Sequence, residues 1–220
     1  MTCGYSFDVL TLQSSISKKW CCENRRRWLM PVLLEQACYN DHNLVNLEET
    51  MMEAMQLSIE TVARAQERLL EALEQMTLEE ANTMPNPLIK SVTWLIWHTA
   101  RELDYQISDL KGQTPLWLSA NWTGRFGLAL PDDTQDWQHS PEEAAKVVVS
   151  DRQLLIDYLS EAVKLTQTYL QDVSLESLDE VIDDNWTPAV TRGARLVSVI
   201  DDAVMHSGQA VYTRRLVIAK

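Results

Sequence analysis

Residues 199–215 read VIDDAVMHSGQAVYTRR, and this stretch has the pattern of a helix that faces a core. At about 100° per residue, Val199 and His206 fall on the same apolar side, so His206 belongs to the buried stripe. Asp202 lies one turn before His206 on nearly the same side, whereas Asp201 points away and is expected in solvent. A carboxylate facing a core is costly without a partner. We therefore expect Asp202 and His206 to share either a hydrogen bond or a cation, and we favour a metal.

The composition predicts a helical protein with an ordinary core. The chain has 220 residues, of which 45% are hydrophobic, with six glycines and seven prolines. Few glycines and prolines beside many Leu, Ala, Glu and Gln favour helices. A formal charge of −13 argues against a nucleic-acid surface, which needs clustered Lys and Arg. Because no long apolar run or secretion signal is present, we expect no membrane segment and a cytoplasmic location.

The first 47 residues differ in character from the rest. All four cysteines (Cys3, Cys21, Cys22 and Cys38) lie there, with a basic cluster and no sustained periodicity. We interpret the cysteines as free thiols. We expect residues 1–47 to be a poorly ordered extension or a segment foreign to the native protein, and residues 48–220 to form the folded domain.

The rest of the chain predicts an all-α four-helix bundle, with long connections after the second and third helices. A bundle stripe runs through residues 48–76, with Gln66 at its one polar step. Asn86 and Pro87 predict the start of the second helix, which runs to Leu110, and Ser140-Pro141-Glu142-Glu143 is a capping box that predicts the start of the third. The expected inner line of the third helix is Val148, Leu155, Tyr158, Ala162, Leu165 and Tyr169.

The sequence leaves open how the connections after the second and third helices are arranged and what covers the second helix. Residues 111–140 carry three tryptophans, which either cover a pocket mouth or pack on the bundle. His42 and His139 are isolated polar-loop histidines, and Ser174 is expected to cap a short turn in the second connection. The second helix is apolar nearly all round, so it is either central in the bundle or covered by a partner subunit, which makes a homodimer plausible.

The second helix supplies a third polar side chain, His98, to the pair on the last helix. Facing helices in a bundle bring side chains to one interior point, so His98, Asp202 and His206 can form a three-ligand face. Two histidines and a carboxylate with open positions suit Zn, non-haem Fe or Ni. The alternative is a hydrogen-bonded polar pair in a helical core.

Two segments, WLIWHTARE at residues 94–102 and HSGQAVYTRR at residues 206–215, resemble the DinB superfamily. This group of bacterial metal-binding bundles includes the bacillithiol and mycothiol transferases, and the resemblance covers roughly residues 48–218. Its members place one metal-binding histidine on the second helix and two on the last helix, four residues apart. His98 and His206 match the first and third of these positions, while Asp202 stands at the second and leaves the identity of the metal open.

The resemblance implies a small-molecule enzyme, most simply a metal-dependent transferase that joins a low-molecular-weight thiol to a small electrophile in stress or detoxification. Gln209 is then expected to orient a ligand, with Glu102 or Tyr105 as acid or base. The alternatives are a metal hydrolase that uses water and a non-catalytic, dimeric ligand-binding or stress-associated bundle.

Overall fold

The computed structural model describes residues 55–219 of the chain. The predicted extension at residues 1–47, its four cysteines and His42 lie outside the described residues. Within residues 55–219, no helix is both long and apolar enough to cross a membrane.

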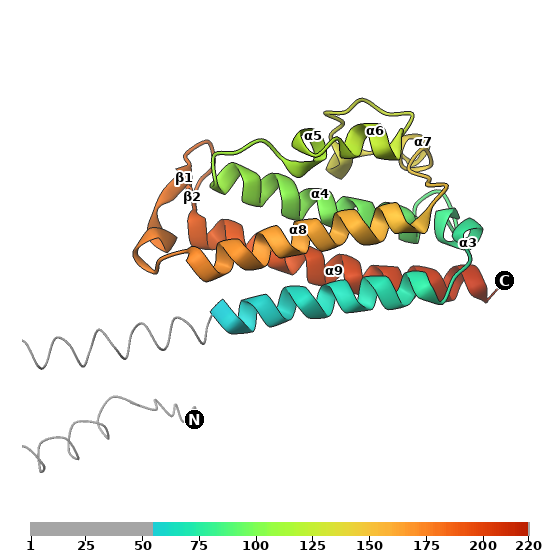
Figure 1. Cartoon of the computed structure of the whole chain (residues 1–220), viewed down its shortest axis with the longest axis horizontal. Helices are drawn as coiled ribbons and strands as arrows, with labels where there is room; N and C mark the ends of the chain where they lie inside the picture. The colour runs from blue at the N-terminus through green and yellow to red at the C-terminus, as the bar shows by residue number, and fades with distance from the viewer. Residues whose placement is uncertain (1–54, 220) are drawn as a thin grey trace, which may run out of the picture. The chain divides into compact units, whose positions relative to one another are not determined.

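Four long helices lie alongside one another, as the all-α prediction requires (Figure 1). They are the helix of residues 55–74, α4 (Val92–Leu110), α8 (Arg152–Asp172) and α9 (Arg192–Ile218). Helix α4 packs against both α8 and α9, so it is the central element of the core. Besides the helices, the described part contains a small antiparallel pair, β1 (Val181–Asp183) and β2 (Val190–Thr191), which the sequence pattern did not predict.

The first long helix buries the predicted stripe, including Val62, Leu69 and Leu73. Gln66 fills the polar step of that stripe because its amide nitrogen donates to Ser160 Oγ on α8, at 3.1 Å. A short helix, α3 (Leu78–Asn82), follows, with Thr77 as the capping residue. Gln66 therefore connects two helices and does not interrupt the buried stripe of the first long helix.

The predicted start of the second helix at Asn86 and Pro87 is wrong, because α4 begins at Val92. Its N-cap is Ser91, whose Oγ accepts a hydrogen bond from the Trp94 amide at 3.0 Å. The side chain of Asn86 instead accepts from the Leu88 amide at 2.9 Å. An asparagine that bonds to the backbone two residues on forms a turn and competes with helix formation.

Helix α4 is buried on most of its sides because the chain itself covers it. Part of that cover is the connection after α4, which contains α5 (Leu116–Ser119) and α6 (Trp122–Phe126) over the bundle (Figure 1). The buried carboxylate of Asp104 on α4 anchors α5 by accepting from the Leu116 and Trp117 amides at 2.7 and 2.8 Å. The central position of α4 therefore removes the reason for expecting a partner subunit over this helix.

The capping box at Ser140 is confirmed, but it starts only the short helix α7 (Pro141–Ala144). The long third helix, α8, begins eleven residues later at Arg152, with Asp151 as its N-cap. The backbone of Val149 is bonded on both sides to the Asn82 side chain, at 2.9 and 3.2 Å, so it is unavailable for a helix. Val148, expected on the inner line, is 47% exposed for this reason.

The connection before α9 holds a 3-10 turn, η3 (Glu176–Asp179), and the β1–β2 pair. Ser174 does not cap that turn through its side chain as predicted; its carbonyl accepts from the Ser177 amide at 3.2 Å. Helix α9 then begins after Thr191, whose Oγ1 accepts from the Ala194 amide. Helix α9 includes residues 199–215 and packs along α4.

Candidate metal centre

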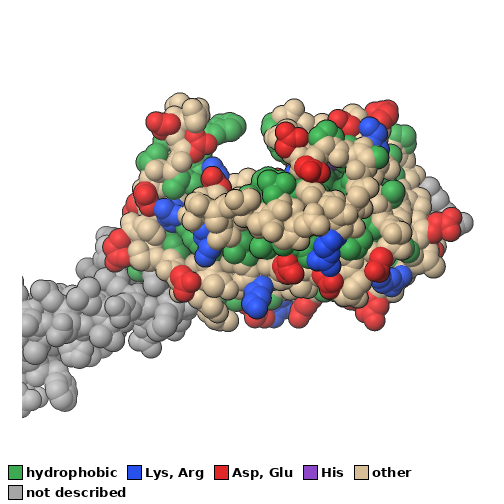
Figure 2. All heavy atoms as spheres, turned by 45° about the horizontal axis from the view of Figure 1, so that its top comes forward, with side chains coloured by type: hydrophobic (Ala, Val, Ile, Leu, Met, Phe, Trp, Pro, Cys, Tyr) green, Lys and Arg blue, Asp and Glu red, His purple; other side chains and the backbone are tan. Residues whose placement is uncertain are grey.

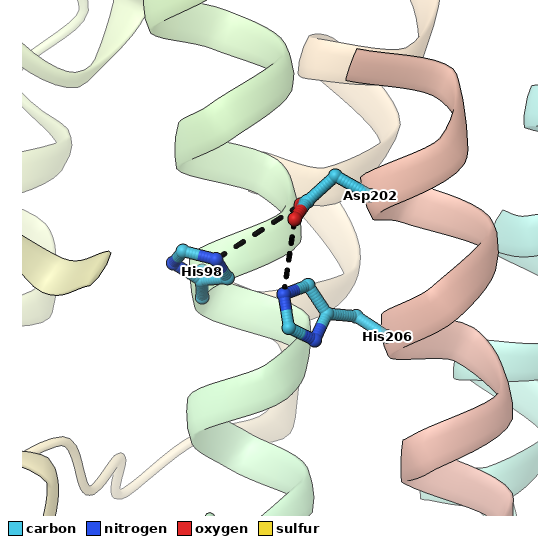
Figure 3. Close-up of side chains that lie close together, drawn as sticks. All are labelled: His98, Asp202 and His206. Carbon is cyan, nitrogen blue, oxygen red and sulfur yellow. Dashed lines mark ion pairs between the residues drawn. The ribbon is translucent and has the colours of Figure 1, made fainter. Parts of the chain in front are cut away.

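Helix α9 presents Asp202 and His206 to the interior as a pair. Their closest atoms, Asp202 Oδ1 and His206 Nε2, are 3.3 Å apart (Figure 3). His206 is buried and Asp202 half-buried, while Asp201 is exposed as the helical geometry predicts. Burial would by itself lower the pKa of His206, but the hydrogen bond to Asp202 and the charge of that carboxylate outweigh it and raise the pKa.

Helix α4 brings His98 to the same point from across the bundle (Figure 3). His98 Nε2 lies 3.9 Å from Asp202 Oδ2, and one ligand atom from each of the three residues lies within 4.8 Å of the others. Ligands held about 2 Å from one tetrahedral metal are themselves roughly 3 to 3.5 Å apart. Small side-chain adjustments would therefore let all three groups reach a shared ion.

Asp202 gives an independent indication that a cation fits here. Its Oδ2 atom is buried and has no hydrogen-bond partner among the described residues. A buried carboxylate oxygen without a donor is costly, and a metal ion would satisfy it. Two imidazoles and one carboxylate form a donor set that suits Zn, Ni or non-haem Fe.

Each histidine has its other nitrogen occupied, which leaves Nε2 facing Asp202. His206 Nδ1 donates to the side-chain oxygen of Gln209 at 2.8 Å. His98 Nδ1 donates to Asp136 Oδ2 at 2.9 Å. Partners of this kind fix the tautomer and the ring orientation of metal-binding histidines.

Asp136 was missed by the sequence reasoning, because it lies on the connection between α4 and α8, where no periodicity marks it. It belongs to a 3-10 turn, η2 (Asp136–Gln138), and is buried. The nearest recognisable sequence motif is the capping box at Ser140. It marks where this connection ends and does not single out Asp136.

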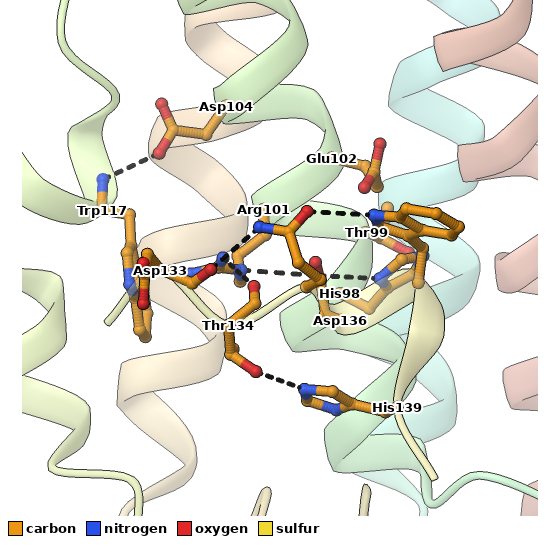
Figure 4. A network of polar contacts seen from close by, with 12 residues as sticks. His98, Thr99, Arg101, Glu102, Asp104, Trp117, Asp133, Thr134, Asp136 and His139 are labelled. Carbon is orange, nitrogen blue, oxygen red and sulfur yellow. Dashed lines mark hydrogen bonds and ion pairs between the residues drawn. The ribbon is translucent and has the colours of Figure 1, made fainter. Parts of the chain in front are cut away.

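Arg101, three residues after His98 on α4, also lies close to Asp136 (Figure 4). Its Nε lies 3.4 Å from Asp136 Oδ2, and its Nη2 donates to the Thr134 carbonyl at 3.0 Å. The guanidinium lies over three aromatic rings, those of Trp97, Tyr105 and Trp117. Burial would raise the pKa of Asp136, but the hydrogen bond from His98 and the Arg101 charge hold it below its usual value.

His139 is not the isolated loop histidine that the sequence predicted. Its Nδ1 accepts from Trp94 Nε1 at 3.1 Å. Its Nε2 is 2.8 Å from Thr134 Oγ1 (Figure 4). Trp94 in turn stacks on His98, with ring centroids 4.5 Å apart. The connection thus fixes the orientation of His98 through both Asp136 and Trp94.

A second cluster of possible ligands, His98, Glu102 and Asp136, shares one histidine with the first. Here the His98 Nδ1 and the Asp136 carboxylate already satisfy each other, and Arg101 balances the charge. The first cluster contains the unsatisfied oxygen of Asp202, so it is the better metal centre.

A cavity of about 470 Å³ opens beside Asp202, between α4, α9 and the β1–β2 pair. Glu102 and Arg195 line it with Asp202, and Trp186, which is 66% exposed, lies at its edge. Figure 2 shows the surface hollowed between the end that carries the β1–β2 pair and the end that carries α5 to α7. Of the three candidate ligands, Asp202 lines this cavity, so a small molecule bound there would contact the Asp202 side of the candidate metal centre.

Glu102, Tyr105 and Gln209, the candidate acid, base or orienting residues, differ in whether they line this cavity. Burial, with added repulsion from Asp136 and Asp202, raises the pKa of Glu102 despite the opposing effect of His98, and Glu102 lines the cavity. Tyr105 is not among the residues that line this cavity; its ring lies against Arg101, and its buried hydroxyl has no hydrogen-bond partner among the described residues. Gln209 contacts His206, as described above.

A helical bundle whose core joins two histidines and a carboxylate defines a class of metal-binding proteins. A sequence model of the DinB superfamily matches residues 61–210, and the chain belongs to this family. The chain is also similar to the crystal structure of a conserved protein from Enterococcus faecalis, with 68% identity and a TM-score of 0.73 over 75% of this chain and 97% of that chain. A search of curated proteins gave no match.

Proposed function

We propose that this protein is a metal-dependent enzyme that transfers a low-molecular-weight thiol to a small electrophile. The observation that carries the proposal is the orientation of two imidazole Nε2 atoms toward one carboxylate whose buried Oδ2 lacks a partner. His98, Asp202 and His206 would hold the metal, with Zn, Ni or Fe as the candidates. Family membership supports metal binding, and the adjoining cavity supports a small substrate.

When bound, a divalent metal supplies positive charge that lowers the pKa of a thiol or a water molecule beside it. The residues of the chain do the rest. Gln209 and Asp136 accept from Nδ1 of His206 and of His98 and so orient the two rings, and Trp94 packs against the ring of His98. Trp186 and Arg195 shape the cavity in which the electrophile lies.

Glu102 is positioned to accept the thiol proton, because its carboxylate lines the same cavity as Asp202. In the transfer, the thiol sulfur forms a bond to the electrophilic carbon and the bond from that carbon to its leaving group breaks. The proton goes to Glu102, and the leaving group departs with the bonding electrons. No oxidant or reductant is needed.

A thiol-consumption assay tests this function. The metal-loaded full chain is mixed with cysteine and a chromogenic aryl halide, and thioether formation is followed by absorbance. We expect turnover that requires metal and falls about 10²- to 10⁴-fold in Glu102→Gln, the range for loss of an acid–base group. The exposed Glu142→Gln on α7 removes one negative charge away from the cavity and is the matched control.

The same assay distinguishes the alternatives. Halide release without thiol consumption would identify a hydrolase that uses water. Metal binding with no turnover of any thiol in a panel of small thiols and electrophiles would contradict an enzymatic role and favour a ligand-binding bundle.

A further inference from the structure

A groove of about 480 Å³, which we call the Lys90 groove, lies between the turn before α4 and the C-terminal half of α9. It is lined by residues 88–90 and Leu95 and, on α9, by Gly208, Gln209, Tyr212 and Thr213. None of the three candidate metal ligands lines it. Clefts of this size with apolar walls and a few polar groups are typical of sites for small molecules. The polar groups of the groove therefore indicate which molecule it takes.

Lys90 is the only charged residue that lines the groove. Its ammonium group donates to the His139 carbonyl at 3.0 Å and lies 5.1 Å from the ring centroid of Trp94. Within residues 55–219, two of its three N–H donors have no acceptor and no carboxylate forms an ion pair with it. Burial lowers the pKa of Lys90, and Glu143 opposes this effect without reaching ion-pair distance. A half-buried ammonium without a counter-ion favours an anionic ligand.

Two polar side chains of α9 add further donors to the groove. Thr213 is only 2% exposed, yet its hydroxyl makes no hydrogen bond in the described part of the chain. A buried hydroxyl of this kind is costly unless a ligand or a water molecule bonds to it. Gln209 uses its side-chain oxygen to accept from His206, which leaves its amide nitrogen as a donor. An ammonium, a hydroxyl and an amide together suit the oxygens of a carboxylate, which only accept hydrogen bonds.

The apolar walls of the groove suit the rest of such a ligand. Leu88 and Tyr212 are 85% and 61% exposed, although both have large apolar surfaces. An apolar body between them would remove this area from water. Gly208 keeps the groove open, because a Cβ placed there would meet no atom of the chain within 4 Å and packing does not require glycine. The groove thus combines one cationic position with an apolar wall.

We propose that the Lys90 groove binds a small apolar carboxylate, with the carboxylate at Lys90 and the apolar body between Leu88 and Tyr212. Thr213 and Gln209 supply further hydrogen bonds from α9. The contact pairs a charge-assisted hydrogen bond with burial of apolar surface, so neither a neutral analogue nor a small inorganic anion uses both. The groove is lined by none of the candidate metal ligands, so this inference does not depend on the proposed function.

Fluorine NMR of the full chain tests the proposal, with para-(trifluoromethyl)benzoate as the probe and the neutral para-(trifluoromethyl)benzamide as its matched control. We expect saturable broadening of the benzoate resonance with a Kd below about 1 mM, an ordinary affinity for a ligand of this size. The amide should bind at least about tenfold more weakly. In Lys90→Met, affinity for the benzoate should fall at least about tenfold and approach that of the amide. Lys164→Met, which removes an exposed positive charge from α8, should leave both affinities unchanged.

Two further variants separate the groove from folding and from the metal centre. Gly208→Leu should abolish binding of the benzoate while retaining the helical circular dichroism spectrum, because Gly208 lines the groove and a Cβ there meets no atom of its own chain. Asp202→Ala removes a candidate metal ligand and should leave benzoate binding unchanged. Absence of benzoate binding in the wild type, equal affinity in the wild type and Lys90→Met, or loss of binding in Asp202→Ala would overturn the proposal.

Discussion

Asp136 Oδ2 lies 2.9 Å from His98 Nδ1, although 38 residues separate the two in sequence. The carboxylate is buried, and Arg101 Nε lies 3.4 Å from the same oxygen. It therefore fixes the proton of His98 on Nδ1 and leaves Nε2 to face Asp202. The connection after α4 is part of the metal centre for this reason.

Replacing Asp136 should weaken metal binding. Asp136→Asn keeps the shape of the side chain but weakens the hydrogen bond that orients the His98 ring. We expect a loss of about 10- to 100-fold in affinity for Zn, the usual effect of losing such a partner. Competition with a chromogenic chelator measures it, and Glu142→Gln on the neighbouring α7 should have no effect. Unchanged affinity in Asp136→Asn would show that His98 is oriented by packing alone.

Arg101 should contribute strongly to stability. Arg101→Met leaves the buried carboxylate of Asp136 without its cation, and removing one member of a buried ion pair costs about 3–5 kcal/mol. Urea denaturation of the metal-free protein measures the loss. In the double variant Arg101→Met/Asp136→Asn, the loss should be smaller than the sum of the two single losses, because the uncompensated charge is gone. Strict additivity would mean that the two side chains do not interact.

A change at Asp202 should alter metal preference. Asp202→His supplies a third imidazole one turn before His206 and should raise affinity for Ni and Zn. Asp202→Ala removes a ligand and should lower affinity for both, while the exposed neighbour Asp201→Ala serves as the control. Isothermal titration calorimetry of the three variants decides the point. Equal affinities in the wild type and Asp202→Ala would exclude Asp202 as a ligand.

The stability of the metal-free protein should fall in acid partly through His139. Burial is the main cause of its lowered pKa, and protonation of Nδ1 would break the bond from Trp94. Unfolded chains therefore bind this proton more readily, so the stabilisation is present above pH ~6.5 and is lost as the pH falls below it. His206 has a raised pKa and acts in the opposite direction, so the test compares variants.

In that test, the free energy of unfolding is measured at pH 7.5 and 5.5. The wild type should lose more stability between these values than His139→Gln, whose amide can accept from Trp94 without titrating. An equal or larger loss in His139→Gln would contradict the assigned role of His139.

The helical periodicity was enough to predict the bundle, but not the ends of two helices. Residues 199–215 and the predicted inner line of the third helix follow a strict pattern, and their burial was predicted correctly except for Val148, which is exposed and precedes α8, and Leu165, which is half-buried. The errors at Asn86 and at Ser140 have one physical cause. Side chains of Asn86 and Asn82 occupy backbone groups that a continuous helix would use, and the Asn82 contact spans 67 residues. Contacts over that separation leave no local signal.

The candidate site was predicted from its helical residues and missed on its loop residue. His98, Asp202 and His206 lie at helix positions that periodicity orients, so their meeting could be expected. Asp136 depends on how residues 111–140 fold over α4, which periodicity does not address. The role of Arg101 was likewise hidden, because a charged residue on a helix is ordinarily assigned to the solvent face.

Metal content measured on the purified full chain tests the central claim most directly. The account predicts about one divalent ion per chain by elemental analysis, together with a rise in melting temperature on adding Zn or Ni to the metal-stripped protein. Both effects should be lost when His98, Asp202 and His206 are changed to alanine together. Absence of bound metal in the wild type, with no thermal stabilisation by Zn, Ni, Fe or Mn, would contradict it.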